Sequence, residues 1–221
     1  AQINVVVSSI QVLTTNPVVE SWGHFPNERH RLLQLLSGTP GLVLLSGDVH
    51  HAEILDVRAG LPPSNHDNGG QFLEITSSGL THSCTGPFYG KLCNPILDLF
   101  PVHRYRNQNI QEDNRLVVEP PSYFTERNFG ILDVDWTTET MTVNVFDVHG
   151  HLALTTGSLS VLQSTQLSAQ ELFMVAPCID GHLRKYIKWV ALPLFGMVAL
   201  FLFKRTLNSP QQEETTKLKT S

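Results

Sequence analysis

The strongest candidate for chemistry in this sequence is a short run that combines carboxylates and imidazoles, Ser46-Gly47-Asp48-Val49-His50-His51-Ala52-Glu53. Asp48 and His50 stand two residues apart after an apolar run, and Gly47 permits a sharp turn or the close approach of a ligand. A carboxylate with an imidazole suits Zn²⁺, Fe or Mn²⁺ and can bind one ion of a two-metal hydrolytic site. Glu53 can serve as the acceptor that fixes the tautomer of an imidazole. Taken alone, an Asp-x-His pattern is more often an Asp that caps a turn beside a hydrogen-bonded, partly buried His.

Two further motifs flank this run, and the three together resemble one enzyme family. The first is Glu20-Ser21-Trp22-Gly23-His24-Phe25-Pro26, followed by Glu28-Arg29, and the last is Thr76-Ser77-Ser78-Gly79-Leu80-Thr81-His82. Their order and spacing resemble successive motifs of the PhoD-like (alkaline phosphatase D-type) metallophosphatases, over roughly residues 1–160. The resemblance implies a four-layered α/β/β/α metallophosphoesterase sandwich, of which this chain corresponds to the C-terminal half.

The resemblance also implies roles for individual residues. Asp48 and His50 match the family's metal-site motif and are therefore the predicted metal ligands and catalytic residues. Weaker candidates for binding the substrate or supporting the pocket are Trp22, His24, His51, Glu53 and His82. The implied cofactors are Fe, Ca, Mn or Zn ions, which would act on a phosphate-ester substrate by activating a bound water and stabilising charge on the leaving oxygen.

One part of the family pattern has no counterpart in this sequence. The family's first acidic metal-binding motifs would precede Ala1, and nothing in residues 1–221 replaces them. The sequence opens without an initiator Met directly into the apolar run Ile3–Val7, which favours a piece of a longer or processed protein. A two-metal site needs carboxylates from both halves of the domain to hold ions about 3.5–4 Å apart. We therefore expect a partial metal site, inactive unless the rest of the domain is supplied.

Hydrophobic patterns predict the elements that position these motifs. Strands are predicted at 3–13, 41–46, 52–58 and 72–76 and, after a stretch without clear periodicity at 83–125, in a meander at 129–136, 141–147 and 151–162. A helix is predicted from Asn27 to a C-cap at Gly38, with Leu32, Leu33, Leu35 and Leu36 in its apolar stripe and Arg29, Arg31 and Gln34 outside it. The fold class is α/β, in which ligands collect at the carboxyl edge of parallel strands.

The C-terminal part predicts a membrane anchor. Trp189–Phe203 is an uncharged run of 15 residues, which is short but sufficient for a membrane helix if Lys188 extends to the interface. The alternative is a buried core helix. The predicted boundaries are 1–163 for the phosphatase part, 164–186 for a juxtamembrane linker, 187–203 for the membrane helix in contact with lipid, and 204–221 for a polar tail.

The tail and the cysteines bear on localisation. Lys217 and Lys219 resemble the cytosolic dilysine retrieval signals of endoplasmic-reticulum proteins, which would place the catalytic part in the lumen of the endoplasmic reticulum or secretory pathway. Cys84 and Cys93 enclose a short loop and can form a local disulfide that leaves Cys178 over, and three unrelated thiols fit the sequence equally well.

Composition narrows the functional classes. The chain has 15 Lys and Arg against 20 Asp and Glu, a net charge of −5, and no basic stripe, so nucleic acid is not an expected partner. It also lacks a Gly-x-Ser-x-Gly elbow and a phosphate-binding Gly-x-x-x-x-Gly-Lys loop. The predicted function is metal-dependent hydrolysis of phosphate esters by a membrane-anchored phosphatase. The alternatives are a non-catalytic membrane-anchored interaction protein and an inactive truncated form, both with a degenerate phosphatase fold.

Overall fold

Two β-sheets and a set of helices make up the computed structural model. It describes residues 3–61, 72–86, 90–99 and 122–175, with a few single positions between 189 and 201. The chain divides into two units, residues 1–180 and residues 181–221. Both sheets and all the elements that position the candidate site belong to the first unit.

The first sheet has five strands in the order β1 (Asn4–Val7), β2 (Leu42–Ser46), β4 (Leu73–Ser77), β3 (Ala52–Asp56) and β5 (Tyr123–Phe124). β1, β2 and β4 run parallel, whereas β3 runs antiparallel to both of its neighbours. The apolar β2 is buried along most of its length, as expected for a strand covered on both faces. Because β1, β2 and β4 are parallel, their carboxyl ends and the loops that follow meet at one edge of the sheet.

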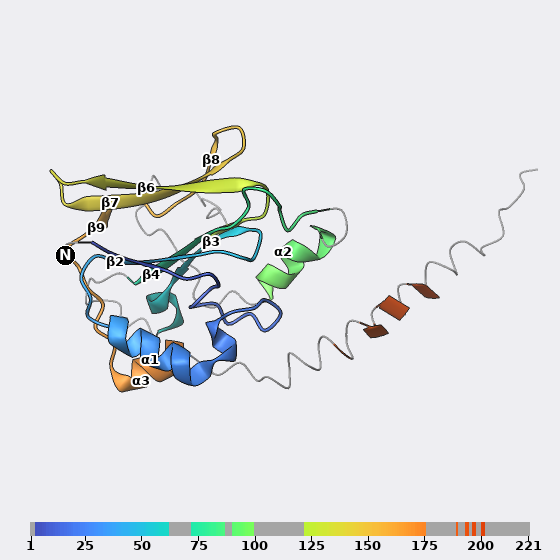
Figure 1. The fold of residues 1–221 in the computed structure, drawn as a ribbon, viewed down its shortest axis with the longest axis horizontal. Helices are drawn as coiled ribbons and strands as arrows, with labels where there is room; N and C mark the ends of the chain where they lie inside the picture. Colours follow the sequence, from blue (N-terminus) through green and yellow to red (C-terminus); the bar gives the residue numbers. More distant parts are fainter. Residues whose placement is uncertain are drawn as a thin grey trace, which may run out of the picture. The chain divides into compact units, whose positions relative to one another are not determined.

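The second sheet is antiparallel and packs against one face of the first (Figure 1). It contains β6 (Asn128–Asp135), β7 (Thr140–Asp147), β8 (Leu152–Thr155) and β9 (Leu159–Ser160). Along β7 every second residue is buried, which is the period of a strand with one face in a core. The core between the sheets includes Val43, Ile54, Leu73 and Ile75 from the first and Met141, Val143 and Val145 from the second.

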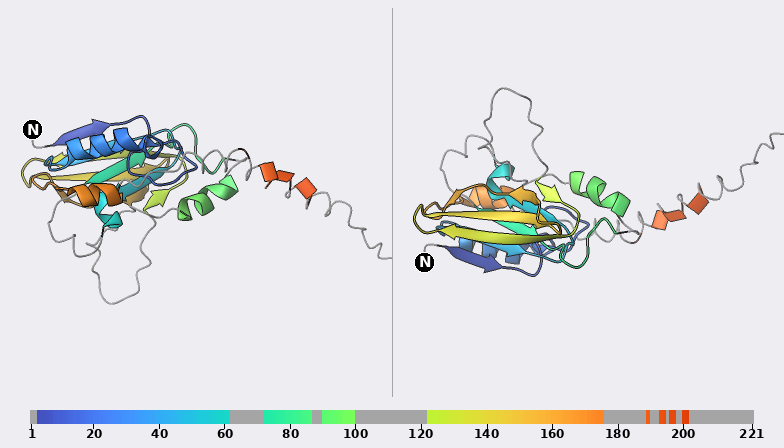
Figure 2. Two further views of the ribbon diagram at one scale, coloured as in Figure 1. Left: turned by 90° about the horizontal axis from the view of Figure 1, so that it is seen from below. Right: turned by 90° about the horizontal axis from the view of Figure 1, so that it is seen from above.

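Helices cover the opposite face of the first sheet (Figures 1 and 2). The helical elements are η1 (Trp22–His24), α1 (Pro26–Leu36), η2 (Val57–Gly60), α2 (Gly90–Asp98) and α3 (Ala169–Val175). α1 begins with Pro26, whose missing N–H costs nothing at the first helical position. Leu33 of α1 and Leu172 of α3 share a core with Leu44 of β2 and Leu55 of β3. The described residues therefore form three layers: helices, a mixed sheet and an antiparallel sheet.

The predicted α/β class is confirmed, and one boundary differs from the sequence-based expectation. The chain was expected to form part of a four-layered sandwich, and among the described residues a helical layer lies on one side of the paired sheets. Residues 164–186 were expected to form a linker, whereas α3 lies within them and buries Leu172 and Val175. Three apolar side chains, those two and Leu167, are sufficient to fix this short segment on the domain.

The predicted membrane helix at 187–203 falls mostly outside the described residues. Within the part of the chain that the structure describes, none of the helices combines the length and the apolar character that crossing a membrane requires. The membrane anchor therefore stays a prediction.

Two buried groups of opposite charge connect α1 to the first sheet. Arg29 of α1 and Glu74 of β4 are both 0% exposed. Arg29 Nη2 donates hydrogen bonds to the carbonyl oxygens of Leu13, at 2.8 Å, and Val175, at 3.3 Å. The two oxygens of Glu74 accept from the N–H groups of Val12 and Leu13 at 2.7 and 2.6 Å. Desolvation lowers the pKa of Arg29 to about 10 and raises the pKa of Glu74, and each charge partly offsets the shift in the other.

Glu74 leads to a prediction about pH. Its pKa in the folded protein is raised above the ordinary value of 4.5, chiefly by desolvation. Its contribution to stability is therefore complete below the unfolded-state pKa and is lost as pH rises through the folded-state pKa. As pH rises above the ordinary pKa of 4.5, Glu74→Gln is expected to remove a component of the unfolding free energy that falls with rising pH. Urea denaturation across that range measures it, with exposed Glu28→Gln as the control; an unchanged pH profile in Glu74→Gln would contradict the prediction.

Candidate functional site

The loop between β2 and β3 carries Asp48 and His50, and it follows the carboxyl end of the parallel strand β2. Both side chains are exposed, and both backbones are left-handed, with φ of 73° at Asp48 and 60° at His50. Residues other than glycine adopt this region at a cost, and such positions cluster at functional sites. The two left-handed residues on either side of Val49 therefore mark this loop as a candidate site on geometry alone.

A second imidazole comes from the loop that follows β4. The rings of His50 and His82 stack, with centroids 5.7 Å apart and an angle of 26° between their planes. His82 is exposed, and its Nδ1 lies 2.9 Å from the hydroxyl oxygen of Thr81. Two of the three sequence motifs thus meet at one point on the edge of the sheet, because β2 and β4 are adjacent and parallel.

Backbone hydrogen bonds tie the two loops together. The N–H of His50 donates to Ser78 Oγ at 3.2 Å, and the N–H of Ser78 donates to the carbonyl of His51 at 3.2 Å. The N–H of Cys84 donates to the carbonyl of His50 at 2.8 Å. The sequence analysis did not assign these roles to Ser78 and Cys84. The available signal was the Ser-Ser-Gly run directly after a predicted strand, at the edge where ligands collect.

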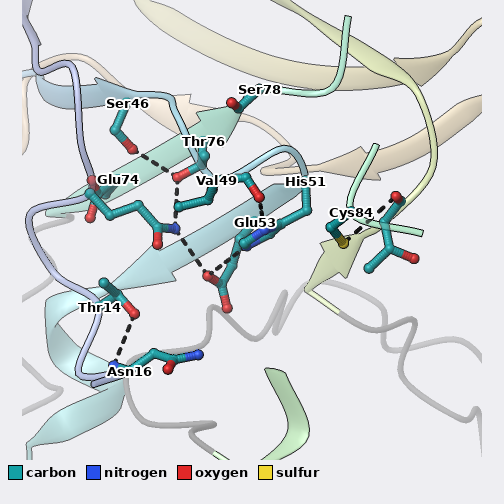
Figure 3. A network of polar contacts seen from close by, with 12 residues as sticks. Thr14, Asn16, Ser46, Val49, His51, Glu53, Glu74, Thr76, Ser78 and Cys84 are labelled. Atoms are coloured by element: carbon teal, nitrogen blue, oxygen red, sulfur yellow. Dashed lines mark hydrogen bonds and ion pairs between the residues drawn. The ribbon is translucent and has the colours of Figure 1, made fainter. Parts of the chain in front are cut away.

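His51 and Glu53, at the end of this loop and the start of β3, are buried and lie close together (Figure 3). His51 Nδ1 bonds the carbonyl of Val49 at 3.0 Å, and its Nε2 lies 3.6 Å from Glu53 Oε2. The same Glu53 oxygen accepts from Gln11 Nε2 at 3.1 Å, and that nitrogen is also 3.0 Å from Thr76 Oγ1. Glu53 therefore faces His51, and through it the loop, rather than the candidate ligand His50. Gln11, which the sequence analysis did not single out, links this carboxylate to β4.

Trp22 and His24 lie on η1, away from the paired imidazoles in the hydrogen-bond network. Trp22 Nε1 donates to Ser8 Oγ at 3.0 Å, just beyond β1, and the Trp22 N–H donates to the carbonyl of Gln11 at 2.9 Å. His24 Nδ1 is 3.3 Å from the carbonyl of Ser21. Its buried Nε2 has no hydrogen-bond partner among the residues that the structure describes. η1 thus contacts the site through Gln11, and the contacts given for Trp22 and His24 reach neither Asp48 nor His50.

The ligand set for a metal ion is incomplete. Asp48, His50 and His82 have the chemistry that borderline transition metals prefer. A catalytic zinc ion usually takes three protein ligands. Within the described ranges, however, no three His, Cys, Asp or Glu side chains are grouped closely enough to hold a metal ion. The residues present therefore supply at most part of a ligand set.

Because the backbone of Asp48 is left-handed, replacing this residue with glycine should affect metal uptake and stability differently. Asp48→Gly is expected to leave the unfolding free energy unchanged or to raise it by up to about 1 kcal/mol, because glycine relieves the left-handed backbone but gains freedom in the unfolded chain. Any metal uptake that needs the carboxylate should fall. Exposed Asp133 of β6 has an ordinary strand backbone, so Asp133→Gly should cost about 0.5–1 kcal/mol. Urea denaturation that shows equal losses in both variants would contradict the prediction.

Comparison with known proteins reveals a distant likeness of fold. No protein-family model and no curated protein sequence matches this chain. A solved structure described as "Structure of PhoD" aligns with it at 16% sequence identity and a TM-score of 0.36. The alignment covers 85% of this chain and 38% of that one, so the chain spans well under half of that structure's length. A likeness this weak carries no argument about activity, and any inference about function has to come from the residues of the site.

Proposed function

We propose that this chain contributes part of the metal site of a phosphate-ester hydrolase. Asp48 and His50 are the ligands in this proposal, and His82 lies beside them. The observation that supports it is the stacking of His50 on His82, with ring centroids 5.7 Å apart, next to an exposed carboxylate in a left-handed loop. Residues with metal-ligand chemistry from two separate motifs meet where the parallel strands end, which is where α/β folds bind ligands.

The chemistry of the donors favours a metal-dependent reaction. The sequence has neither a serine elbow nor a phosphate-binding glycine loop. A metal ion bound at such a site lowers the pKa of its bound water and neutralises charge on the phosphate oxygens. The experiment below determines which ion is bound, among Fe, Ca, Mn and Zn. It also determines whether the substrate is a monoester or a diester.

The chain's own residues orient the proposed ligands. Ser78 holds the N–H of His50, and the buried pair of His51 and Glu53 fixes the carbonyl of Val49 between the two ligands. Partners of this kind usually change metal affinity by about 10–100-fold when they are removed. The site would therefore be preorganised by β3 and β4 on the chain itself, while the remaining ligands would have to come from elsewhere.

Metal binding by the purified protein tests this proposal. Equilibrium dialysis against Zn²⁺, Mn²⁺, Fe²⁺ and Ca²⁺, with p-nitrophenyl phosphate and bis-p-nitrophenyl phosphate as substrates, gives affinity and activity together. Asp48→Asn and His50→Ala are each expected to weaken binding of the preferred ion by at least about tenfold. His149→Ala, in the exposed turn between β7 and β8, is the matched control and should change nothing. Unaltered binding in both site variants would refute the ligand assignment.

A non-catalytic interaction protein is the second candidate, and the incomplete ligand set favours it. In that case Asp48→Asn and His50→Ala would leave ion binding unchanged, and both phosphate esters would stay intact under every metal condition even when the remaining ligands are supplied. Metal binding with hydrolysis that disappears in His50→Ala would exclude this candidate.

We also propose that residues 187–203 anchor the protein in the endoplasmic-reticulum or another secretory-pathway membrane, with the phosphatase part on the luminal side. The support is the uncharged apolar run from Trp189 to Phe203 and the paired lysines of the tail. Deleting residues 187–203 should move the protein from the carbonate-resistant membrane pellet to the supernatant. Recovery of the deletion variant in the pellet would count against this anchor.

A further inference from the structure

A disulfide joins the loop after β4 to helix α2. Cys84 and Cys93 are bonded across nine residues of sequence, which is the local disulfide that the spacing allowed. Cys84 lies two residues beyond His82, and its N–H donates to the carbonyl of His50 at 2.8 Å. The cross-link is therefore attached to the backbone of both imidazole-bearing loops.

Helix α2 is also attached to the domain at both of its ends. Leu97 is its buried residue, whereas Leu92 is 49% exposed. At its far end, Asp98 Oδ1 accepts a hydrogen bond from the hydroxyl of Tyr123 in β5, at 2.9 Å. At its near end, the N–H of Gly90 donates to the carbonyl of Gly86 at 2.8 Å. The C-terminal end of α2 is thus fixed to the first sheet. The disulfide connects Cys84 to this helix and so restricts its position.

The loop beside the disulfide is packed closely against the start of α2. A Cβ on Gly90 would collide with the backbone of Thr85. Thr85 Oγ1 donates to the carbonyl of Thr125, at 3.4 Å, just after β5. Thr85 therefore contacts both the start of α2 and the residue that follows β5, and His82 lies directly before this segment.

Among the described residues, the side chain of His82 makes few contacts. It is exposed, and the contacts that the structure gives it are the hydroxyl of its neighbour Thr81 and the ring of His50. A contact between two exposed rings persists only where the backbones beneath them are fixed, because ordering exposed side chains costs conformational entropy. For His82 that fixed point is Cys84.

We propose that the Cys84–Cys93 disulfide positions His82 against His50, so that the paired imidazoles are present in the oxidised protein and are lost when a dithiol reduces it. In the reduction the S–S bond breaks and each sulfur becomes a thiol. The two electrons and two protons come from the dithiol, which closes to its own disulfide. The consequence for metal binding rests on the proposed function, whereas the consequence for ring geometry does not. The site would then be thiol-sensitive, with Cys84 and Cys93 as positioning residues.

Proton NMR of the full chain tests the ring geometry directly. In the oxidised protein, a cross-relaxation peak is expected between ring protons of His50 and His82. The peak should disappear after treatment with dithiothreitol and its removal under nitrogen, and should return on reoxidation. Zn²⁺ affinity, measured on the same samples, should fall at least tenfold on reduction. The double variant Cys84→Ser/Cys93→Ser should lack the cross-relaxation peak, like the reduced protein, and dithiothreitol should not change its spectrum.

Two controls keep the result specific. Cys178→Ser removes the third cysteine, so any remaining response to the dithiol belongs to the Cys84–Cys93 pair. Methyl resonances of Val143 and Val145, in the core between the sheets, report whether the reduced protein is still folded. The reversible reduction of the native chain keeps the test valid even if the double variant fails to fold.

The outcomes separate this inference from the proposed function. A cross-relaxation peak that survives reduction in the folded protein overturns the positioning role, whatever the metal does. A peak that responds to reduction while Zn²⁺ binds in neither state supports the positioning role and refutes the metal site. If the cross-relaxation peak and Zn²⁺ binding are both lost on reduction and restored by reoxidation, the result supports the positioning role and the metal site.

Discussion

Replacing Arg29 with methionine is expected to lower the free energy of unfolding by about 3–5 kcal/mol, because two buried carbonyl oxygens lose a charged donor, at about 1–3 kcal/mol each. Arg29 is fully buried and contacts segments far apart in the chain, through the carbonyl oxygens of Leu13 and Val175. Its charge also acts on the buried carboxylate of Glu74. Methionine retains a flexible stem of similar length but neither the charge nor the donors. Urea denaturation at neutral pH measures the loss.

Two variants distinguish the buried charge from a general effect of the substitution. Arg31→Met changes an exposed residue two positions further along α1 and should alter stability by no more than about 0.5 kcal/mol. The double variant Arg29→Met/Glu74→Leu should lose less than the sum of the single losses, since it removes both charges. A loss in Arg29→Met no larger than that in Arg31→Met would show that the buried guanidinium does not stabilise the fold.

Arg29 also shows where sequence patterns fail. The sequence predicted α1 to within a residue or two, but it placed Arg29 outside the apolar stripe and Leu35 within it. In the structure Arg29 is 0% exposed and Leu35 is 72% exposed. The helical period in fact aligns Arg29 with Leu33 and Leu36. Arg29 was nevertheless predicted to be exposed because its side chain is charged. The carbonyl oxygens of Leu13 and Val175, which accept its hydrogen bonds, lie on distant segments of the chain, so no local pattern could reveal them.

The strands were predicted better than their arrangement. Apolar runs and alternation located β2, β3, β4, β6 and β7 to within a few residues. The order of the first sheet places β4 between β2 and β3, and this depends on contacts between distant segments rather than on local sequence. α3 was missed because it has only seven residues, too few to show a helical period, and it reaches the core through only a few side chains.

The sequence indicated where the candidate site lies, but not the residues that support it. Asp48 and His50 follow from the motif, and the structure adds that both are left-handed and that His82 reaches His50. Glu53 alternates with core residues along β3, so its side chain faces the helical side of the first sheet, where Gln11 and His51 meet it. Gln11 lies 42 positions before Glu53, which explains why the sequence indicated the carboxylate but not the amide that binds it.

Gly79→Ala is expected to lower the free energy of unfolding by about 2–4 kcal/mol, from overpacking and lost hydrogen bonds. A Cβ at Gly79 would collide with the side-chain amide of Asn128, the first residue of β6. That amide accepts from Ser77 Oγ at 3.0 Å and donates to the carbonyl of Glu126 at 2.8 Å. Displacing it breaks the polar contact between the ends of β4 and β6, and therefore between the two sheets.

Two comparisons isolate the collision as the cause. Gly150 has a left-handed φ of 81° and open space around its Cβ position, so Gly150→Ala tests backbone strain without a clash and should cost about 1–2 kcal/mol. In an Asn128→Ala background the methyl group meets no amide, and Gly79→Ala should then cost less than about 1 kcal/mol. Equal losses in both backgrounds would contradict the steric explanation. Because Ser78 precedes Gly79 and holds the N–H of His50, the same substitution should also weaken the His50–His82 cross-relaxation peak, whereas Gly150→Ala should leave it intact.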